Sequence, residues 1–190
     1  VELPAEQHFL HRRREVQQSQ QIGCRAARTP DRLRGLLVRE VELADQPAIQ
    51  ATLMDTVGTV YMSLGLYREA RPLLESALAR RRVAVDEDPA AVPETLNHLG
   101  DLLSLQAEYQ EAERNYRAAV ELQRQTTTND QQDGIQSRAT VAKSQSGLGY
   151  ALLRLGRLPE AEQALRDALA MQRQLYPGAN ADVARTLQDL

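Results

Sequence analysis

The feature that most constrains the fold is a spacing of small residues that occurs three times along the chain. In each copy, a glycine is followed twelve residues later by an alanine and seven residues further on by a second alanine: Gly58, Ala70 and Ala77; Gly100, Ala112 and Ala119; Gly149, Ala161 and Ala168. The copies are 42 and then 49 residues apart, and a polar stretch, TTTNDQQDG, accounts for the longer spacing. Such a period indicates stacked structural units that bury their apolar faces only against their neighbours.

Each copy predicts two antiparallel helices. The two alanines share one face of the second helix, because seven residues are close to two helical turns. The glycine marks the point where the two helices approach each other. The large residues four positions beyond the first alanine are expected to fill the space between repeats: Leu74, Tyr116 and Leu165. Gly65 and Gly156 are expected to end the first helix in a left-handed conformation, where the second copy carries Ala107.

Composition supports an all-α fold and excludes several functional classes. Only 4% of the residues are aromatic, whereas Ala, Leu, Glu, Gln and Arg, which favour helices, are abundant. The net charge of -3 gives no basic surface for nucleic acid. No apolar run is long enough to span a membrane. The single cysteine, Cys24, can form neither an internal disulfide nor a cysteine-based metal site, and no cofactor is expected.

The spacing resembles that of the tetratricopeptide repeat (TPR). Each glycine is followed three residues later by a large residue, as in that family: Tyr61, Leu103 and Leu152. The 42-residue spacing is similar to the longer repeats of kinesin light chains. The resemblance implies an all-α, right-handed superhelix, or α-solenoid, of antiparallel helix pairs.

The repeat register gives a set of expected boundaries. The chain is expected to continue beyond both ends, because repeat arrays need a polar capping element at each end. The expected segments are a polar helical segment at 1–28, a degenerate leading helix at 29–46 that covers the first repeat, repeats at 47–88, 89–132 and 133–178, and the first helix of a truncated fourth repeat at 179–190.

A second resemblance covers roughly residues 9–80. The string REVELADQPAIQATLMDTVGTVYMSLGLYREARPLLESALARRR resembles the segment that enters the TPR region of bacterial serine/threonine kinases of eukaryotic type. In that family, a kinase domain precedes the repeats, which form a sensory or docking tail. This chain contains no glycine-rich phosphate loop, His-Arg-Asp or Asp-Phe-Gly motif, so any kinase activity would belong to upstream sequence. A cytoplasmic location is expected, or an extracytoplasmic one if a membrane span precedes the array.

The TPR resemblance implies that the first helices line a concave groove that holds a protein or peptide. The residues expected there are Thr52, Asp55, Thr59 and Met62, then Asn97, His98 and Asp101, then Lys143, Tyr150 and Arg154. Asn97 is expected to pair with a peptide backbone, because an amide both donates and accepts hydrogen bonds. The alternative for each residue is an ordinary solvated position.

No group of residues predicts catalysis or metal binding. His8, His11 and Glu15 share a helical face, but a solvated charged helix explains them better than a metal site. The basic runs at 12–14 and 80–82 lie among acidic or polar residues. We therefore predict a non-catalytic scaffold for protein–protein interactions. The alternatives are a self-association module that forms homo-oligomers and an accessory domain that positions a substrate for a catalytic neighbour.

Overall fold

The computed structural model describes residues 46–84, 88, 90–127, 134–178 and 180–190. The expected polar segment at 1–28, the leading helix at 29–46 apart from Gln46, and residues 128–133 of the polar stretch lie outside the described residues. So do His8, His11, Glu15 and Cys24.

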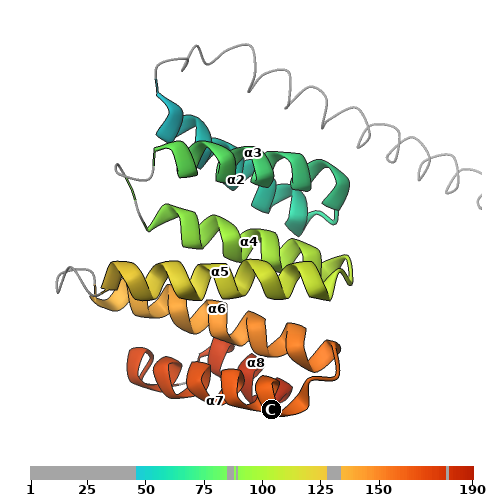
Figure 1. The fold of residues 1–190 in the computed structure, drawn as a ribbon, viewed down its shortest axis with the longest axis vertical. Helices are drawn as coiled ribbons and strands as arrows, with labels where there is room; N and C mark the ends of the chain where they lie inside the picture. Colours follow the sequence, from blue (N-terminus) through green and yellow to red (C-terminus); the bar gives the residue numbers. More distant parts are fainter. Residues whose placement is uncertain (1–45, 85–87, 89, 128–133, 179) are drawn as a thin grey trace, which may run out of the picture. The chain divides into compact units, whose positions relative to one another are not determined.

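The described residues form helices and contain no strand. Three consecutive pairs are followed by a single helix: α2 (Pro47–Ser63) with α3 (Tyr67–Val83), α4 (Ala91–Leu105) with α5 (Tyr109–Thr127), α6 (Gly134–Arg154) with α7 (Leu158–Leu175), and then α8 (Ala181–Asp189). The expected all-α array of antiparallel helix pairs is confirmed (Figure 1).

The turns inside the three pairs share one geometry. Gly65, Ala107 and Gly156 all have positive φ angles, of 74°, 62° and 76°. In each turn, the following amide donates to a carbonyl in the last turn of the first helix, as from Glu108 N to Leu103 O at 2.8 Å. This bond satisfies a carbonyl that the helix end leaves free. The expected glycine ends are confirmed, and Ala107 adopts the same conformation without being glycine.

The six alanines of the repeated spacing are all buried, with at most 1% of their surface exposed: Ala70, Ala77, Ala112, Ala119, Ala161 and Ala168. The glycines lie under the large residue of their own repeat. A methyl group added at Gly58 would lie 2.8 Å from Leu74, and one added at Gly149 would lie 2.5 Å from Leu165. Any larger residue than glycine would therefore push the paired helices apart.

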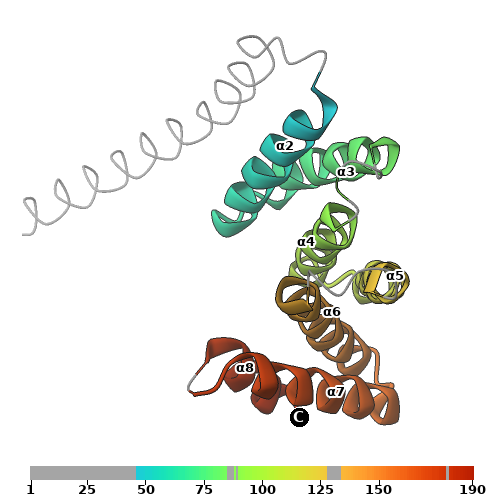
Figure 2. The same cartoon turned by 90° about the vertical axis from the view of Figure 1, so that its left-hand side faces the viewer.

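The helices form two layers. The first helices of successive pairs contact one another, α2 with α4, α4 with α6 and α6 with α8, in addition to their neighbours along the chain. Figure 2 shows these first helices on one side and the second helices α3, α5 and α7 on the other. We call the surface of α2, α4, α6 and α8 the first-helix face and the surface of α3, α5 and α7 the second-helix face.

Candidate functional site on the first-helix face

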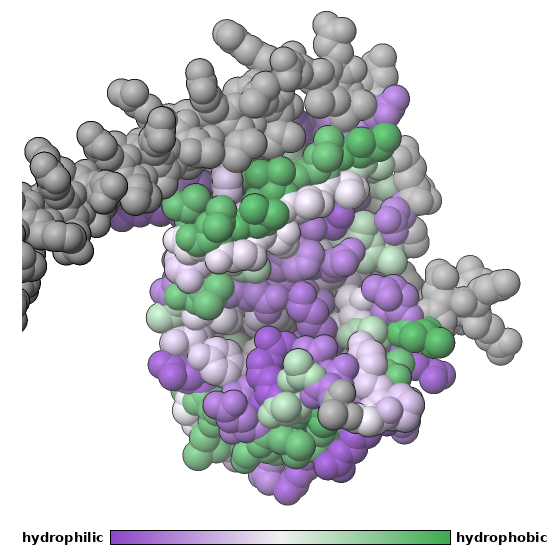
Figure 3. Space-filling model, turned by 180° about the vertical axis from the view of Figure 1, so that it is seen from behind, coloured by the Kyte–Doolittle hydropathy of each residue, from purple (hydrophilic) through white to green (hydrophobic). Residues whose placement is uncertain are grey.

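All ten residues that the sequence selected for partner binding lie on the first helices α2, α4 and α6, which form the first-helix face. Figure 3 views this face, which has a largely hydrophilic centre and a hydrophobic band at the end formed by α2. These side chains differ in exposure and in partners, and they fall into five groups.

Asp55 lies in a buried polar cluster between the first and second repeats. Its two carboxylate oxygens lie 3.1 and 3.0 Å from Nδ1 of His98, and Arg81 Nη1 lies 3.7 Å from Oδ1. Burial alone would raise the pKa of Asp55, but the hydrogen bond and charge of His98 and the charge of Arg81 outweigh it and lower the pKa. The carboxylate therefore only accepts, so Nδ1 of His98 donates.

Arg81 closes this cluster from α3. It donates to the carbonyl of Ala91 at 3.0 Å and to the hydroxyl of Thr95, which joins the end of one repeat to the start of the next. The exposed fractions of Asp55 and Arg81 are only 6% and 8%. The expectation that Asp55 faces an open groove is wrong, because the neighbouring helix covers it. Only His98, whose side chain is 16% exposed, reaches the surface of this cluster.

Asn97 is also buried, with 1% of its surface exposed. Its Oδ1 accepts a hydrogen bond from Ser144 Oγ at 2.8 Å, and its Nδ2 donates to the carbonyl of Thr140 at 3.5 Å. The expectation of an open position for this amide is wrong, because α6 packs over it. Asn97 instead links two neighbouring first helices. Ser146, at the equivalent position one repeat later, pairs with Thr186 at 2.9 Å in the same way.

Asp101 and Lys143 form a half-exposed pair in the centre of the face. Lys143 Nζ lies 3.3 Å from Asp101 Oδ2, and the Tyr116 hydroxyl donates to Asp101 Oδ1 at 2.7 Å. Burial raises the pKa of Tyr116, and the negative charge of Asp101 raises it further. The phenol therefore stays protonated and keeps the carboxylate in place.

Tyr150 and Arg154 form an aromatic and cationic cluster with Tyr109, at the turn end of the second and third repeats. The rings of Tyr109 and Tyr150 meet edge to face, with centroids 6.3 Å apart. The Arg154 guanidinium lies over the Tyr109 ring, 5.0 Å from its centroid. Both tyrosines are half-buried and Arg154 is exposed. Such a cluster combines apolar area with polar groups that a partner can reach.

The remaining three predicted residues lie on α2. Thr52 is exposed and Thr59 half-buried, and each hydroxyl donates to a carbonyl one turn earlier in the helix, at 3.0 and 2.8 Å. Met62 is half-buried and packs against the apolar core. These residues offer a partner mainly aliphatic contact, because their hydroxyl protons are already donated.

Sequence reasoning missed Arg81 and Tyr109. Arg81 lies eleven residues after the first alanine of its repeat, and the equivalent residues Gln123 and Gln172 are also polar and buried. The shared polarity of these three residues at one position of the repeat could have indicated a buried polar site. Tyr109 is equivalent to Tyr67 and Leu158. Its pairing with Tyr150 depends on a contact between repeats that the sequence does not display.

The described part of the chain contains neither a membrane-spanning helix nor a metal-binding cluster. No helix there is long and apolar enough to cross a membrane. Nor does any group of three or more His, Cys, Asp or Glu side chains among those residues have an arrangement that could hold a metal ion.

Comparison with known proteins identifies the repeats. Two tetratricopeptide repeat models match, at residues 49–125 and 141–180. No curated protein matches. Among solved structures, the N-terminal domain of stress-induced protein-1 (STI-1) from C. elegans is similar, with a TM-score of 0.53 and 17% identity over 76% of this chain and 97% of that one. BtubC (BKLC) from P. vanneervenii has a TM-score of 0.59 and 19% identity.

The second likeness covers 86% of this chain but only 60% of BtubC. At these identities, both likenesses concern the fold. Together with the repeat models, they support a protein–protein interaction module. The two repeat models jointly cover most of residues 49–180, and the paired helices have the spacing seen in the sequence. The chain therefore belongs to the tetratricopeptide repeat family.

Proposed function

We propose that the first-helix face binds a segment of a partner protein, and that Tyr150 and Arg154 are its main anchors. The observation that carries this proposal is the cluster of Tyr109, Tyr150 and Arg154. Its two tyrosines are half-buried and its arginine is exposed, so a partner can reach all three side chains. Tyrosine and arginine contribute a large share of the binding energy at protein interfaces. Asp101 and Lys143, next to this cluster, supply hydrogen-bonding groups of both charges.

His98, Thr52, Thr59 and Met62 extend the proposed surface toward the first repeat. Asp55 and Asn97 have a different part in it. They hold neighbouring first helices in register and touch no partner directly, because both are buried. Substituting them would alter binding only through the spacing of the helices.

The test selects ligands from a displayed library of random seven-residue peptides, with the whole 190-residue chain as bait. We expect Tyr150→Ala and Arg154→Ala each to lower the affinity for the selected peptides at least tenfold in a calorimetric titration. Arg166→Ala is the matched control, because Arg166 is an exposed arginine on the second-helix face that pairs with Glu162. Unchanged affinity in both first-helix variants would contradict the proposal.

We further propose that the array is the docking or sensory region of a larger bacterial signalling protein, such as a serine/threonine kinase, and lies in the cytoplasm. The support is the resemblance of residues 9–80 to the entry segment of such kinases. The test is the coding sequence upstream of the codon for Val1. A glycine-rich loop and His-Arg-Asp and Asp-Phe-Gly motifs are expected there, and an upstream region without them contradicts this assignment.

Self-association is a second candidate, because α2 exposes an apolar stripe. Ile49, Leu53, Val60 and Leu64 recur along one side of the helix, and Leu64 is 66% exposed. If the stripe pairs two chains, Val60→Glu should lower the mass measured by light scattering. The control is Val83→Glu, which replaces another valine, 88% exposed and outside the stripe, and should leave the measured mass unchanged. A wild-type chain that stays monomeric at every concentration tested contradicts this candidate.

A further inference from the structure

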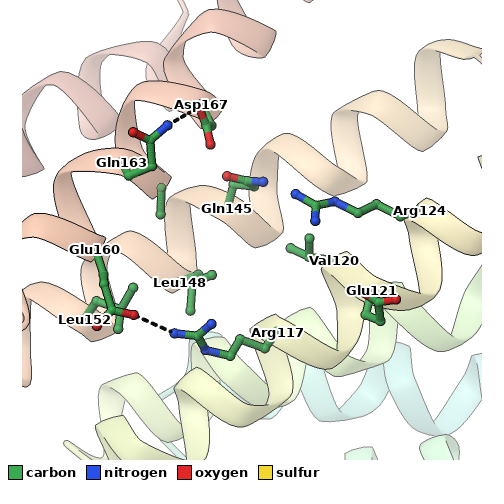
Figure 4. Close-up of a pocket in the computed structure, with 11 residues that line it drawn as sticks. Arg117, Val120, Glu121, Arg124, Gln145, Leu148, Leu152, Glu160, Gln163 and Asp167 are labelled. Atoms are coloured by element: carbon green, nitrogen blue, oxygen red, sulfur yellow. Dashed lines mark hydrogen bonds and ion pairs between the residues drawn. The ribbon is translucent and has the colours of Figure 1, made fainter.

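A hollow on the second-helix face lies between the second and third repeats. It has a volume of about 470 Å³, which falls within the range of roughly 300–1,000 Å³ typical of ligand pockets. The helices α5 and α7 form its walls and α6 forms its floor (Figure 4). It lies on the opposite layer of helices from the face proposed above, so the two sites are separate.

The hollow exists because this interface differs from the preceding one at two equivalent positions. Between the first and second repeats, Leu78 and Leu96 belong to one apolar cluster that fills the corresponding space. Val120 and Gln145 stand at those positions between the second and third repeats. Valine is shorter than leucine, and the carboxamide cannot join an apolar cluster without losing its hydration.

Gln145 is the most informative residue of the hollow. Only 6% of its surface is exposed, and it is one of the residues that line the hollow. Figure 4 shows the side chain directed into the hollow, between Arg124 and Asp167. The amide opens onto the hollow, where a ligand can reach it. Because the second repeat carries leucine at this position, the amide gives this interface hydrogen-bonding groups that the preceding interface lacks.

The two walls offer opposite polarity around this amide. On α5, the guanidinium of Arg124 borders the hollow and forms no ion pair with any of the described residues. On α7, Asp167 accepts one hydrogen bond, from Gln163 at 2.9 Å, and has capacity for more. The far end of the hollow is closed by Arg117, which is already bound to Glu160 at 3.2 Å (Figure 4).

The dimensions and polarity fit a peptide main chain. Each wall extends over eight residues of helix, 117–124 and 160–167, or about 10 Å at roughly 1.5 Å per step, which is about the length of three residues of extended chain. Each edge of an extended chain presents both carbonyls and amides, because successive residues direct their N–H and C=O groups to alternate sides. A carbonyl can accept from Arg124 while an amide donates to Asp167, and Gln145 can both donate to and accept from the same segment.

We propose that this hollow is a second binding site, which holds an extended peptide segment of a partner protein by its main chain through Gln145, Arg124 and Asp167. Small aliphatic side chains of that segment would contact Val120 on the α5 wall and Leu148 on the floor.

The test uses the whole chain carrying Tyr150→Ala as bait for the random seven-residue peptide library, so that the first-helix cluster is disabled. We expect enriched peptides whose affinity falls at least tenfold when Gln145→Leu is added and about fivefold when Arg124→Ala is added. Gln174→Leu, on an exposed glutamine of α7, is the matched control and should change affinity less than twofold. Arg124 is exposed, so its variant will fold whatever happens at Gln145.

A second measurement concerns the protein without peptide. Gln145→Leu restores the leucine of the second repeat and places an apolar side chain at a largely buried position, so we expect the melting temperature to rise by about 2–4 °C. A lower melting temperature would show that Gln145 is a structural residue and overturn the proposal. Peptides that bind the Gln145→Leu chain as well as its parent, or a bait that enriches no peptide, would overturn it too.

Discussion

Tyr116 links two repeats through contacts with two glycines. A methyl group added at Gly100, in its own repeat, would lie 2.6 Å from the Tyr116 ring, and one added at Gly147 in the next repeat would overlap the same ring. The hydroxyl continues to Asp101 on the first-helix face. One side chain therefore crosses from the second-helix layer to the surface proposed for binding.

This geometry makes Gly147→Ala a sensitive test of the packing. The added methyl group must displace a buried ring, so we expect the free energy of unfolding to fall by about 1–3 kcal/mol in urea denaturation. The same substitution in a Tyr116→Leu chain should cost much less, because the equivalent residues of the other repeats are leucines. An equal loss in both backgrounds would mean that Tyr116 is not the cause.

Ala107 offers the opposite test, since its φ of 62° suits glycine better than alanine. A left-handed conformation costs a residue with a side chain about 1–2 kcal/mol, and glycine in turn loses about 0.5–1 kcal/mol more on ordering. We therefore expect Ala107→Gly to stabilise the protein by about 0.5–1 kcal/mol. Gly156→Ala, in the same turn of the third repeat, should destabilise it by a similar amount, and effects of the same sign at both sites would refute the argument.

At the scale of helices, the sequence predicted where the polar residues lie but not which of them face solvent. Asp55 and Asn97 were correctly assigned to the first-helix layer. Both lie three residues before the glycine of their repeat, a position that faces the next first helix rather than the open surface. That distinction depends on how closely α2, α4 and α6 pack side by side, which a pattern within one repeat does not contain.

The buried cluster at the junction of α2, α3 and α4 should make stability depend on pH. The folded-state pKa of Asp55 is lowered from its ordinary 3.8, so its stabilising contribution is complete above that value and is lost as the pH falls through the lower folded pKa. Asp55→Ala should lose about 3 kcal/mol near neutral pH, because Arg81 stays buried without its carboxylate.

Urea denaturation as a function of pH measures both effects. The difference in unfolding free energy between wild type and Asp55→Ala should be constant from pH 7 to about pH 4 and should shrink below the ordinary Asp pKa of 3.8. The control is Asp182→Ala, because Asp182 is an exposed carboxylate that pairs with Arg185 at 3.3 Å. A difference for Asp55→Ala that does not shrink in acid would show that its charge is not what stabilises the junction.

At the scale of the whole array, three registered sets of one glycine and two alanines were enough to predict paired helices and their order. The sequence did not reveal the hollow between the second and third repeats, although Gln145 at a leucine position was visible in the alignment of the copies. A polar residue there could equally have been bonded to a neighbour. In the part of the chain that the structure describes, the positions of α5 and α7 instead leave Gln145 facing the hollow.

The array should also unfold by parts when its centre is weakened, since in the described part of the chain each helix pair contacts only the pairs next to it. Ala112 is fully buried in the apolar cluster that joins the second and third repeats, so Ala112→Arg should lose about 2–4 kcal/mol through overpacking and an unpaired buried charge. Ala79→Arg, at an exposed position of α3, is the control and should change stability by less than about 0.5 kcal/mol.

The central position of Ala112 then determines the form of the transition. With α4 and α5 loosened, α2 and α3 lose the pair that connects them to α6, α7 and α8, so the single unfolding transition expected of the wild type should separate into two. Hydrogen exchange should show early loss of protection in α4 and α5, with protection retained longest in α6 and α7, which are the most extensively packed pair. An Ala112→Arg chain that melts within a degree of wild type, or that exchanges uniformly along its length, would mean that the repeats are not coupled through this pair.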